Sequence, residues 1–221
     1  METTLMMELA VFSPRWRGRL MAGILVVLSA AAFLLPSPAA RAAAPGEFYA
    51  GRIQAYRQSK DAYFRDHECS PLAGAAKHSF VGLPYYPVDP RFRVAGTFKA
   101  YLFARSRRSP AADGGELKIR EVGRFLFDFD GRQHTLLVWQ AAGQDRLTVV
   151  FSDATSGAET YGAGRLVDLQ PLAGNRYEVD FNYAANPYCC YNHDFQCPLP
   201  PAGNRLPFAV QAGEKVVPAK P

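Results

Sequence analysis

A two-residue period on either side of a short turn is the feature that most constrains how this chain can fold. Phenylalanine occupies positions 125, 127 and 129, Asp130-Gly131 follows, and residues 134–139 form the next apolar run. An Asp-Gly pair between two such runs is typical of a β-hairpin, because both residues tolerate the positive φ angles of its turn. This segment therefore predicts two antiparallel strands.

The same period recurs along the chain after Pro71. Further strands are predicted at residues 80–86, 94–103, 117–122, 147–151, 161–169, 177–183 and 206–210, with Pro207 making the last an edge or partly irregular strand. Before Pro71, residues 47–66 carry apolar side chains at helical spacing, among them Tyr49, Ile53 and Tyr56. One helix followed by many short strands predicts a mainly β fold, an antiparallel sandwich or barrel-like sheet with one N-terminal amphipathic helix.

Length and composition indicate one folded domain behind a targeting segment. Of the 221 residues 48% are hydrophobic and 20% charged, which excludes a disordered chain and fits a single domain over residues 43–221. Arginines precede the uncharged run Leu20–Leu35, and Ala40 and Ala42 supply the small residues that signal peptidases need. We therefore expect residues 1–42 to be a signal peptide and the protein to be periplasmic or secreted. The alternative is an uncleaved N-terminal anchor, although the run is shorter than the roughly 20 residues of a membrane span.

Charge narrows the classes of partner. The chain has 25 Lys and Arg against 20 Asp and Glu, and residues 1–42 contain four of the arginines and two of the glutamates. The net charge of +3 that remains is modest, and we interpret the cluster of Arg105, Arg107 and Arg108 as a solvated loop. Nucleic acid is therefore not an expected partner. Membrane contact is expected only through the N-terminal segment, if that segment stays uncleaved.

The four cysteines are interpreted from the expected export. Two disulfides are predicted for an oxidising compartment. Because a bond between the adjacent Cys189 and Cys190 would strain the peptide, two pairings remain. We prefer Cys189–Cys197 with Cys69–Cys190. The alternative is a metal site, because Cys190-x2-His193-x3-Cys197 has ligand-like spacing. A second clear ligand pair is missing from the sequence, although His67 and Cys69 could contribute. We expect disulfides, no metal and no cofactor.

Lys60 is the most unusual residue of the predicted helix. It lies in the middle of the apolar stripe, where a charge is out of place. Its amine either reaches outward along the helix or points into a pocket and pairs with a buried carboxylate. For the second interpretation, Glu159 and Asp180 are the predicted partners.

Two polar segments supply the other candidate ligand-binding residues. These candidates are Asp153, Glu159, Tyr161 and Arg165 in the first segment, and Asp180, Asn182, Asn186 and Tyr191 in the second. Glu178, Asp180 and Asn182 share one face of a predicted strand, which is either a solvated face or the lining of a cavity. Gly162-x-Gly164 lacks the strand-to-helix context of a phosphate loop and is interpreted as a bulge or a close backbone approach.

The same segments do not contain a complete catalytic set. Ser152, Thr155 and Ser156 are nucleophiles by residue type, yet no Gly-x-Ser-x-Gly elbow surrounds them. His134 and His193 are candidate bases by type only. The catalytic residues, if there are any, are not predicted.

Several motifs together carry a resemblance to a known family. They are Lys60-Asp61, Ser70-Pro71-Leu72, Phe80-x-Gly82-Leu83-x-Tyr85, Asp153-Ala-Thr-Ser-Gly-Ala-Glu159-Thr-Tyr161-Gly-x-Gly-Arg165, Asp180-Phe-Asn182, Asn186-Pro-x-Cys189, Cys197-Pro-Leu-Pro-Pro and Ala212-Gly213-Glu214. With these motifs the chain resembles, from about Tyr49 to Glu214, the bacterial and archaeal domain-of-unknown-function family numbered 1684. The resemblance implies one domain of that family across the mature chain and no assigned activity.

The functional hypotheses differ in whether Lys60, Glu159, Arg165 and Asp180 meet. Residues 184–205, rich in Asn, Pro and Cys, form a long connection that is typical of a binding loop or lid. The favoured hypothesis is a domain that binds a small polar or anionic ligand in a pocket under this loop. The alternatives are a hydrolase-type enzyme that uses carboxylate, Tyr and Arg groups, and a structural envelope protein without a pocket.

Overall fold

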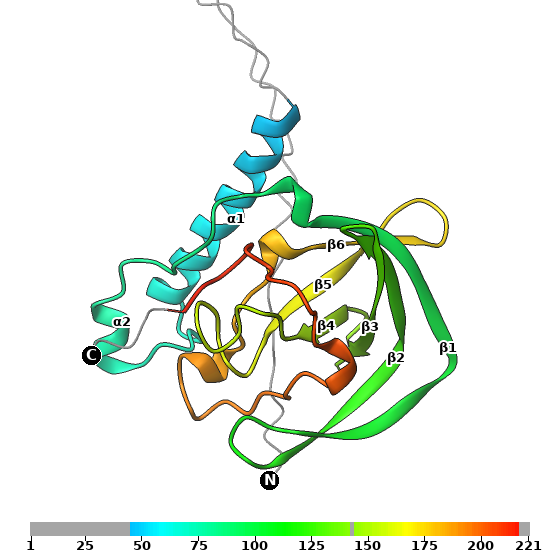
Figure 1. The fold of residues 1–221 in the computed structure, drawn as a ribbon. Coiled ribbons are helices and arrows are strands. Elements are labelled where there is room, and N and C mark those ends of the chain that lie inside the picture. The colour runs from blue at the N-terminus through cyan, green and yellow to red at the C-terminus, as the bar shows by residue number, and fades with distance from the viewer. Residues whose placement is uncertain (1–44, 142–143, 217–221) are drawn as a thin grey trace, which may run out of the picture. The chain divides into compact units, whose positions relative to one another are not determined.

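The computed structural model describes residues 45–141 and 144–216 (Figure 1). The expected signal peptide, residues 1–42, lies outside the described residues. Within the described part, no helix combines the length and the apolar character needed to cross a membrane.

Six antiparallel strands form a closed barrel, which confirms the barrel-like alternative of the predicted fold class. The strands are β1 (Arg93–Pro110), β2 (Glu116–Phe129), β3 (Arg132–Gln140), β4 (Leu147–Phe151), β5 (Arg165–Pro171) and β6 (Arg176–Asp180). They follow one another around the barrel in chain order, and β6 closes it by pairing with β1. The helices are α1 (Pro45–Asp66) and the short α2 (Gly74–His78), with 3₁₀ turns at Pro90–Phe92, Phe181–Tyr183, Tyr188–Cys190 and Ala202–Asn204.

The predicted hairpin is confirmed as the connection between β2 and β3. Asp130 and Gly131 have φ angles of 49° and 71°, and Phe129 pairs with Arg132 across the turn. Two positive φ angles match the right-handed twist of the flanking strands. The alternating phenylalanines enter the barrel, where Phe125 and Phe127 stack at 5.4 Å.

Packed side chains fill the barrel interior. Its core consists of buried aromatic and aliphatic residues from all six strands, among them Phe98, Phe125, Leu136, Val149, Val167 and Val179. Such a filled interior matches a small barrel whose inward side chains make a core. The polar candidate residues therefore lie in the layers around the barrel.

Two of the predicted strands are wrong. Residues 80–86 form an irregular connection in which Tyr85 makes a single bridge to Glu214. Residues 206–210 also lie outside the sheet, because their backbone groups bond to the segment after β4, as in the bond from the Ala154 amide to the Phe208 carbonyl. Apolar alternation there reflects burial against loops, which a period of two cannot distinguish from a ladder.

Helix α1 lies against the outside of the barrel, beside the C-terminal segment (Figure 1). Its buried face carries residues at steps of three and four, namely Tyr49, Ile53, Arg57, Lys60 and Phe64. Aromatic pairs fix this face to the segment after β6: the Tyr56 and Tyr183 rings lie 4.8 Å apart, and those of Phe64 and Tyr191 lie 4.9 Å apart. Residues 210–216, here named the C-terminal strap, cover the same face.

Candidate functional site

Lys60 and Glu214 form a buried ion pair between α1 and the C-terminal strap. The two side chains are 7% and 1% exposed, and the Lys60 amine donates to a Glu214 carboxylate oxygen. The prediction that the Lys60 amine points inward to a carboxylate is thus confirmed. The predicted partners, Glu159 and Asp180, are wrong, because the strap brings Glu214 over the helix and occupies the position.

The second Glu214 oxygen accepts two further hydrogen bonds. The Asn186 amide and the Tyr191 hydroxyl each donate to Glu214 Oε2 at 2.7 Å. Burial and the neighbouring Glu214 charge raise the pKa of Tyr191 well above its ordinary value. Lys60, Asn186 and Tyr191, three of the predicted site residues, therefore meet around a carboxylate that the prediction did not include.

Arg165 and Asp153 make a second buried ion pair, at 2.8 Å. The remaining Arg165 contacts go to the strap, since its Nη atoms also donate to the carbonyl oxygens of Val210, Ala212 and Glu214. Arg165 thereby fastens the strap to the barrel. The Gly164 beside it has a φ of 87°, and a Cβ there would lie 2.6 Å from the Phe151 carbonyl oxygen, so its predicted role in a close backbone approach is confirmed.

Asp180 and Asn182 belong to the contact between α1 and the barrel. The Tyr49 hydroxyl donates to Asp180 Oδ2 at 2.7 Å, and the Asn182 amide group donates to Asp180 and to the Asp89 carbonyl. Both interpretations of this face, solvated or cavity-lining, are wrong, because the helix covers it. Glu178 on the same strand pairs with Arg93 at 2.7 Å.

Glu159 and Tyr161 lie apart from both ion pairs. The Glu159 side chain is 46% exposed and lies 4.0 Å from the Lys215 amine, whereas the Tyr161 hydroxyl lies 4.0 Å from Cys189 Sγ. The predicted convergence of Lys60, Glu159, Arg165 and Asp180 in one pocket is therefore wrong. Each of these four side chains has its own partner in a different contact.

Arg57 is the functional candidate that the sequence analysis missed. Only 5% of it is exposed, Nη1 donates to the Tyr86 carbonyl at 2.9 Å, and the guanidinium lies over the Tyr85 ring at 4.5 Å. Nε and Nη2 have no hydrogen-bond partner among the described residues. Burial lowers the pKa of Arg57 from its ordinary value. The spacing of four from Ile53 and three to Lys60 already places Arg57 on the buried face and could have identified it.

Two more buried polar groups, which contact the C-terminal strap, also lack a hydrogen-bond partner in the described part of the chain. The Tyr85 hydroxyl and Asn186 Oδ1 have no hydrogen-bond partner within the described ranges. Tyr85 bridges to Glu214, and the Asn186 amide group donates to the Lys215 carbonyl, so both lie against the strap. Unpartnered buried polar groups are rare in folded proteins, and a cluster of them calls for an explanation.

The cysteines are free thiols in the structure. Cys189 and Cys197 are neighbours, since the Cys189 amide lies 3.2 Å from Cys197 Sγ. Hydrogen bonding from the Cys197 thiol lowers the pKa of Cys189, and burial raises the pKa of Cys190 to about 12. Cys69 is exposed beyond the end of α1. Both predicted bridges stay predictions for the oxidised protein.

Taken together, the fold and the site define a closed six-stranded antiparallel barrel with a helix and a strap on its outside that are joined by a buried ion pair. Residues 78–215 of the chain match the family described as "Protein of unknown function (DUF1684)". The chain therefore belongs to this family, as the sequence motifs indicated.

A solved structure of similar fold comes from an archaeon. It is the solution NMR structure of an uncharacterized protein from Haloarcula marismortui, which is 34% identical over 77% of this chain and 96% of that chain, with a TM-score of 0.61. Among curated proteins there is no match.

Proposed function

We propose that this protein binds a small anion, of the carboxylate or phosphate class, on Arg57 between α1 and the C-terminal strap. The observation that carries the proposal is the pair of unpartnered nitrogens, Nε and Nη2, on a guanidinium that is 5% exposed. These two atoms form one edge of the guanidinium, and that edge presents two parallel N–H groups. Carboxylate and phosphate oxygens accept from such an edge in bidentate fashion.

The charges around Arg57 support an anionic occupant. Glu214 and Asp180 act on Arg57 electrostatically, yet both carboxylates already have other partners, Lys60 and Tyr49 respectively. A buried cation without its own counter-ion is costly to the folded protein, and an anion bound there offsets that cost. Arg165 differs from Arg57 in its counter-ion, because it pairs with Asp153 and both of its Nη atoms donate hydrogen bonds, so that only its Nε lacks a partner among the described residues.

Two unpartnered polar groups that contact the strap also support a preference for ligands with both donors and acceptors. The unpartnered Tyr85 hydroxyl can donate to a ligand oxygen, and the unpartnered Asn186 Oδ1 can accept from a ligand hydroxyl. Asn186 and Tyr191 come from the long loop 184–205, so this location keeps the expected position of the ligand beneath that loop. Export to the periplasm or outside the cell, through residues 1–42, is part of the same proposal.

Binding is favoured over the enzyme and structural alternatives. A hydrolase needs a base beside a reachable nucleophile. The closest arrangement is Thr155, whose hydroxyl donates to Asp153 at 2.6 Å, but both are buried and Asp153 is paired with Arg165. A purely structural protein gives no reason for an unpaired Arg57.

Thermal unfolding with added inorganic phosphate and with acetate tests the proposal. An anion that binds only the folded state raises the free energy of unfolding by about 2.7 kcal/mol at a hundred times its Kd. Arg57→Met should remove this response. Without added anion it should lower the free energy of unfolding by no more than about 1 kcal/mol, because it deletes one hydrogen bond together with an unpaired charge.

The matched control is Arg52→Met, which removes an exposed arginine of the same helix. It should keep the full anion response of the wild type. Equal stabilisation of wild type and Arg57→Met by both anions would contradict the proposal, because the effect would then be independent of the guanidinium.

A further inference from the structure

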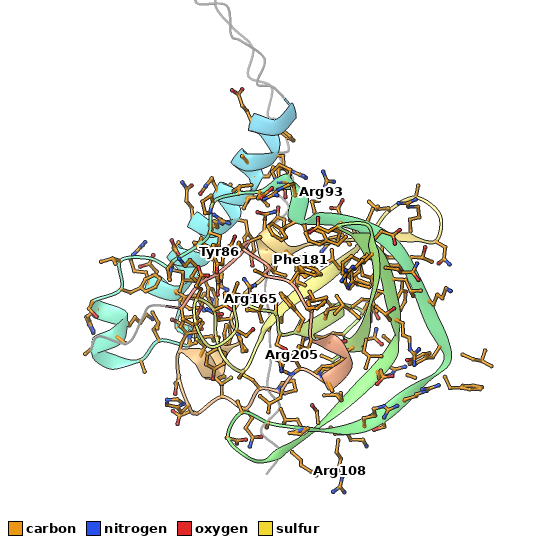
Figure 2. The ribbon with its side chains drawn as sticks, viewed as in Figure 1. Tyr86, Arg93, Arg108, Arg165, Phe181 and Arg205 are labelled. Carbon is orange, nitrogen blue, oxygen red and sulfur yellow. The ribbon has the colours of Figure 1, made fainter. Side chains whose placement is uncertain are left out.

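The β1–β2 hairpin carries the positive charge of the domain. Residues 99–124 contain seven Lys and Arg side chains against three acidic ones, a net charge of +4. Residues 43–221 as a whole have a net charge of +3, so the rest of the domain is slightly acidic. Figure 2 shows Arg108 on this hairpin, well away from Tyr86 and Arg165 and thus from the proposed anion site.

A large bulge in β1 exposes two neighbouring apolar residues within this basic region. Ala100 pairs with Gly123 and Arg105 with Glu121, so residues 101–104 oppose Val122 alone. Leu102 and Phe103 within the bulge are 90% and 78% exposed. Bulges of this kind are features that redirect side chains, and here one directs two large apolar side chains into solvent.

Polar contacts hold the base of the bulge in place. The Tyr101 hydroxyl donates to the buried Glu121 at 2.9 Å, Arg124 donates to the same hydroxyl, and Arg105 lies over the Tyr101 ring at 4.2 Å. Arg107 completes the arrangement with an ion pair to Glu121 at 2.9 Å. The exposure of Leu102 and Phe103 therefore follows from an ordered structure.

Exposed cations surround the two apolar residues along both strands. They are Lys99, Arg105, Arg107, Arg108, Lys118, Arg120 and Arg124. An open recess of about 510 Å³ on the paired ends of β1 and β2 is lined by Ser106, Arg107, Arg108, Glu116, Leu117 and Lys118. Its cations can contact a phosphate-containing headgroup, although Arg107 and Arg108 also form ion pairs with Glu121 and Glu116.

We propose that the β1–β2 hairpin docks this domain on the surface of an anionic phospholipid bilayer. Leu102 and Phe103 insert at the boundary between headgroups and acyl chains, and the surrounding cations bind lipid phosphates. Apolar insertion and attraction to anionic headgroups together give peripheral membrane binding. This surface is distinct from the Arg57 site. The arginines within Arg105–Arg108 are solvent-exposed as the sequence predicted, but they lie on strand β1, so the prediction of a loop is wrong.

The combination of groups selects a bilayer over two other occupants. A second copy of this chain would bring two +4 hairpins together, which repel each other. Nucleic acid would use the cations and could stack on Phe103, but it gives no role to the neighbouring Leu102. A bilayer offers both negative charge for the cations and an apolar phase for Leu102 and Phe103.

Vesicle sedimentation of residues 43–221 tests the proposal. The described residues 45–141 and 144–216 belong to one compact unit, and the archaeal structure matches 77% of this chain over 96% of its own, so the measurement can omit the N-terminal segment. At low salt, the protein should bind vesicles with 30 mol% phosphatidylglycerol in phosphatidylcholine at least about 25-fold more tightly than vesicles of pure phosphatidylcholine. This value corresponds to two engaged cations, each of which contributes about fivefold. The preference should collapse in 0.5 M NaCl.

Two variants separate the contributions. Leu102→Ser/Phe103→Ser should lower binding by about tenfold or more, and Lys118→Glu/Arg120→Glu should abolish the preference for phosphatidylglycerol. All four positions are outside the core, so folding is preserved. The control for the apolar variant is Val81→Ser, because the Val81 side chain is 94% exposed in another part of the fold. The control for the charge variant is Arg52→Glu/Arg65→Glu on α1, which makes the same change in net charge.

Three results would overturn the proposal. One is equal binding of wild type and Leu102→Ser/Phe103→Ser to anionic vesicles. Another is a dimer in sedimentation velocity that the same variant converts to monomer, which would assign Leu102 and Phe103 to self-association. The third is binding of an oligonucleotide more tightly than the anionic vesicles.

Discussion

The Lys60 amine and the Glu214 carboxylate join helix α1 to the C-terminal strap. The two residues are 154 positions apart in the chain, and both side chains are almost completely buried. The pair holds the C-terminal strap on helix α1 and closes the layer in which Arg57 is enclosed. The geometry of the proposed anion site therefore depends on this ion pair.

Breaking the pair from one side should be costly. Lys60→Met should lower the free energy of unfolding by about 3–5 kcal/mol, because Glu214 is left as a buried charge without its cation. Lys60→Met/Glu214→Gln should recover a large part of the loss, since the neutral amide still accepts from Asn186 and Tyr191. Urea unfolding of the four proteins gives the coupling energy. Additive losses would contradict the assigned pairing.

Arg165 should be required to hold the C-terminal strap. Arg165→Met removes three hydrogen bonds to strap carbonyl groups and leaves Asp153 buried without a cation, so a loss of at least about 3 kcal/mol is expected. Limited proteolysis should cut within residues 210–216 in this variant before any other site. Arg205→Met, which removes an exposed arginine, is the control and should leave the cleavage pattern unchanged.

Gly213 should not tolerate a side chain. Its φ is 78°, and a Cβ there would lie 2.4 Å from the Ala184 carbonyl oxygen and 2.7 Å from that of Phe181. Gly213→Ala should therefore destabilise the protein by more than the roughly 1 kcal/mol typical of a positive φ alone. Gly174→Ala has a similar φ of 68° with open space around it, and thermal unfolding should show a much smaller loss.

Alkaline pH should unfold the protein together with tyrosine ionisation. Burial raises the pKa of eight tyrosines above 10.0, namely residues 49, 56, 85, 86, 161, 183, 188 and 191. The folded state keeps these protons when the unfolded state loses them, so stability falls as the pH rises above about 10. Absorbance at 295 nm should increase in one cooperative step with the loss of circular dichroism. Complete ionisation of all eleven tyrosines in folded protein would contradict this.

Oxidation should join Cys189 to Cys197. The 3.2 Å contact between the Cys189 amide and Cys197 Sγ places the two residues side by side. Peptide mapping of exported, non-reduced protein should identify this bridge in preference to any bridge between Cys190 and Cys197. Reduction should lower the free energy of unfolding by about 2–4 kcal/mol. Free Cys189 and Cys197 in the exported protein would contradict the pairing.

The sequence predicted the elements whose conformation depends on residues close together in the chain. The hairpin at Asp130-Gly131 and the helix over residues 47–66 follow from turn chemistry and from periodicity, and both are present. Residues 80–86 and 206–210 have the same alternation, but they are buried against loops and not paired in a ladder. Whether an alternating segment joins a sheet depends on which backbone groups lie next to it, and that is a tertiary property.

The candidate site shows the same division. The sequence singled out Lys60, because it is a charge in the centre of an apolar stripe, and of its two interpretations the structure shows the inward one. Its partner could not be found in this way, since Glu214 reaches Lys60 only through the path of the strap around the barrel. The helical spacing predicts that Arg57 is buried, but that two of its nitrogens lack a partner among the described residues can be known only from the positions of the surrounding atoms.

The most direct test of the proposed function is the ¹H–¹⁵N resonance of the Arg57 Nε–H group during a titration with inorganic phosphate. Arg57→Lys identifies this resonance by its disappearance. Because Nε has no hydrogen-bond partner among the described residues, an arriving phosphate oxygen should shift it downfield in a saturable manner. The Nε–H resonance of the exposed Arg52 should stay in place. An Arg57 resonance that does not move at any phosphate concentration, or that moves only in parallel with that of Arg52, would contradict anion binding at Arg57.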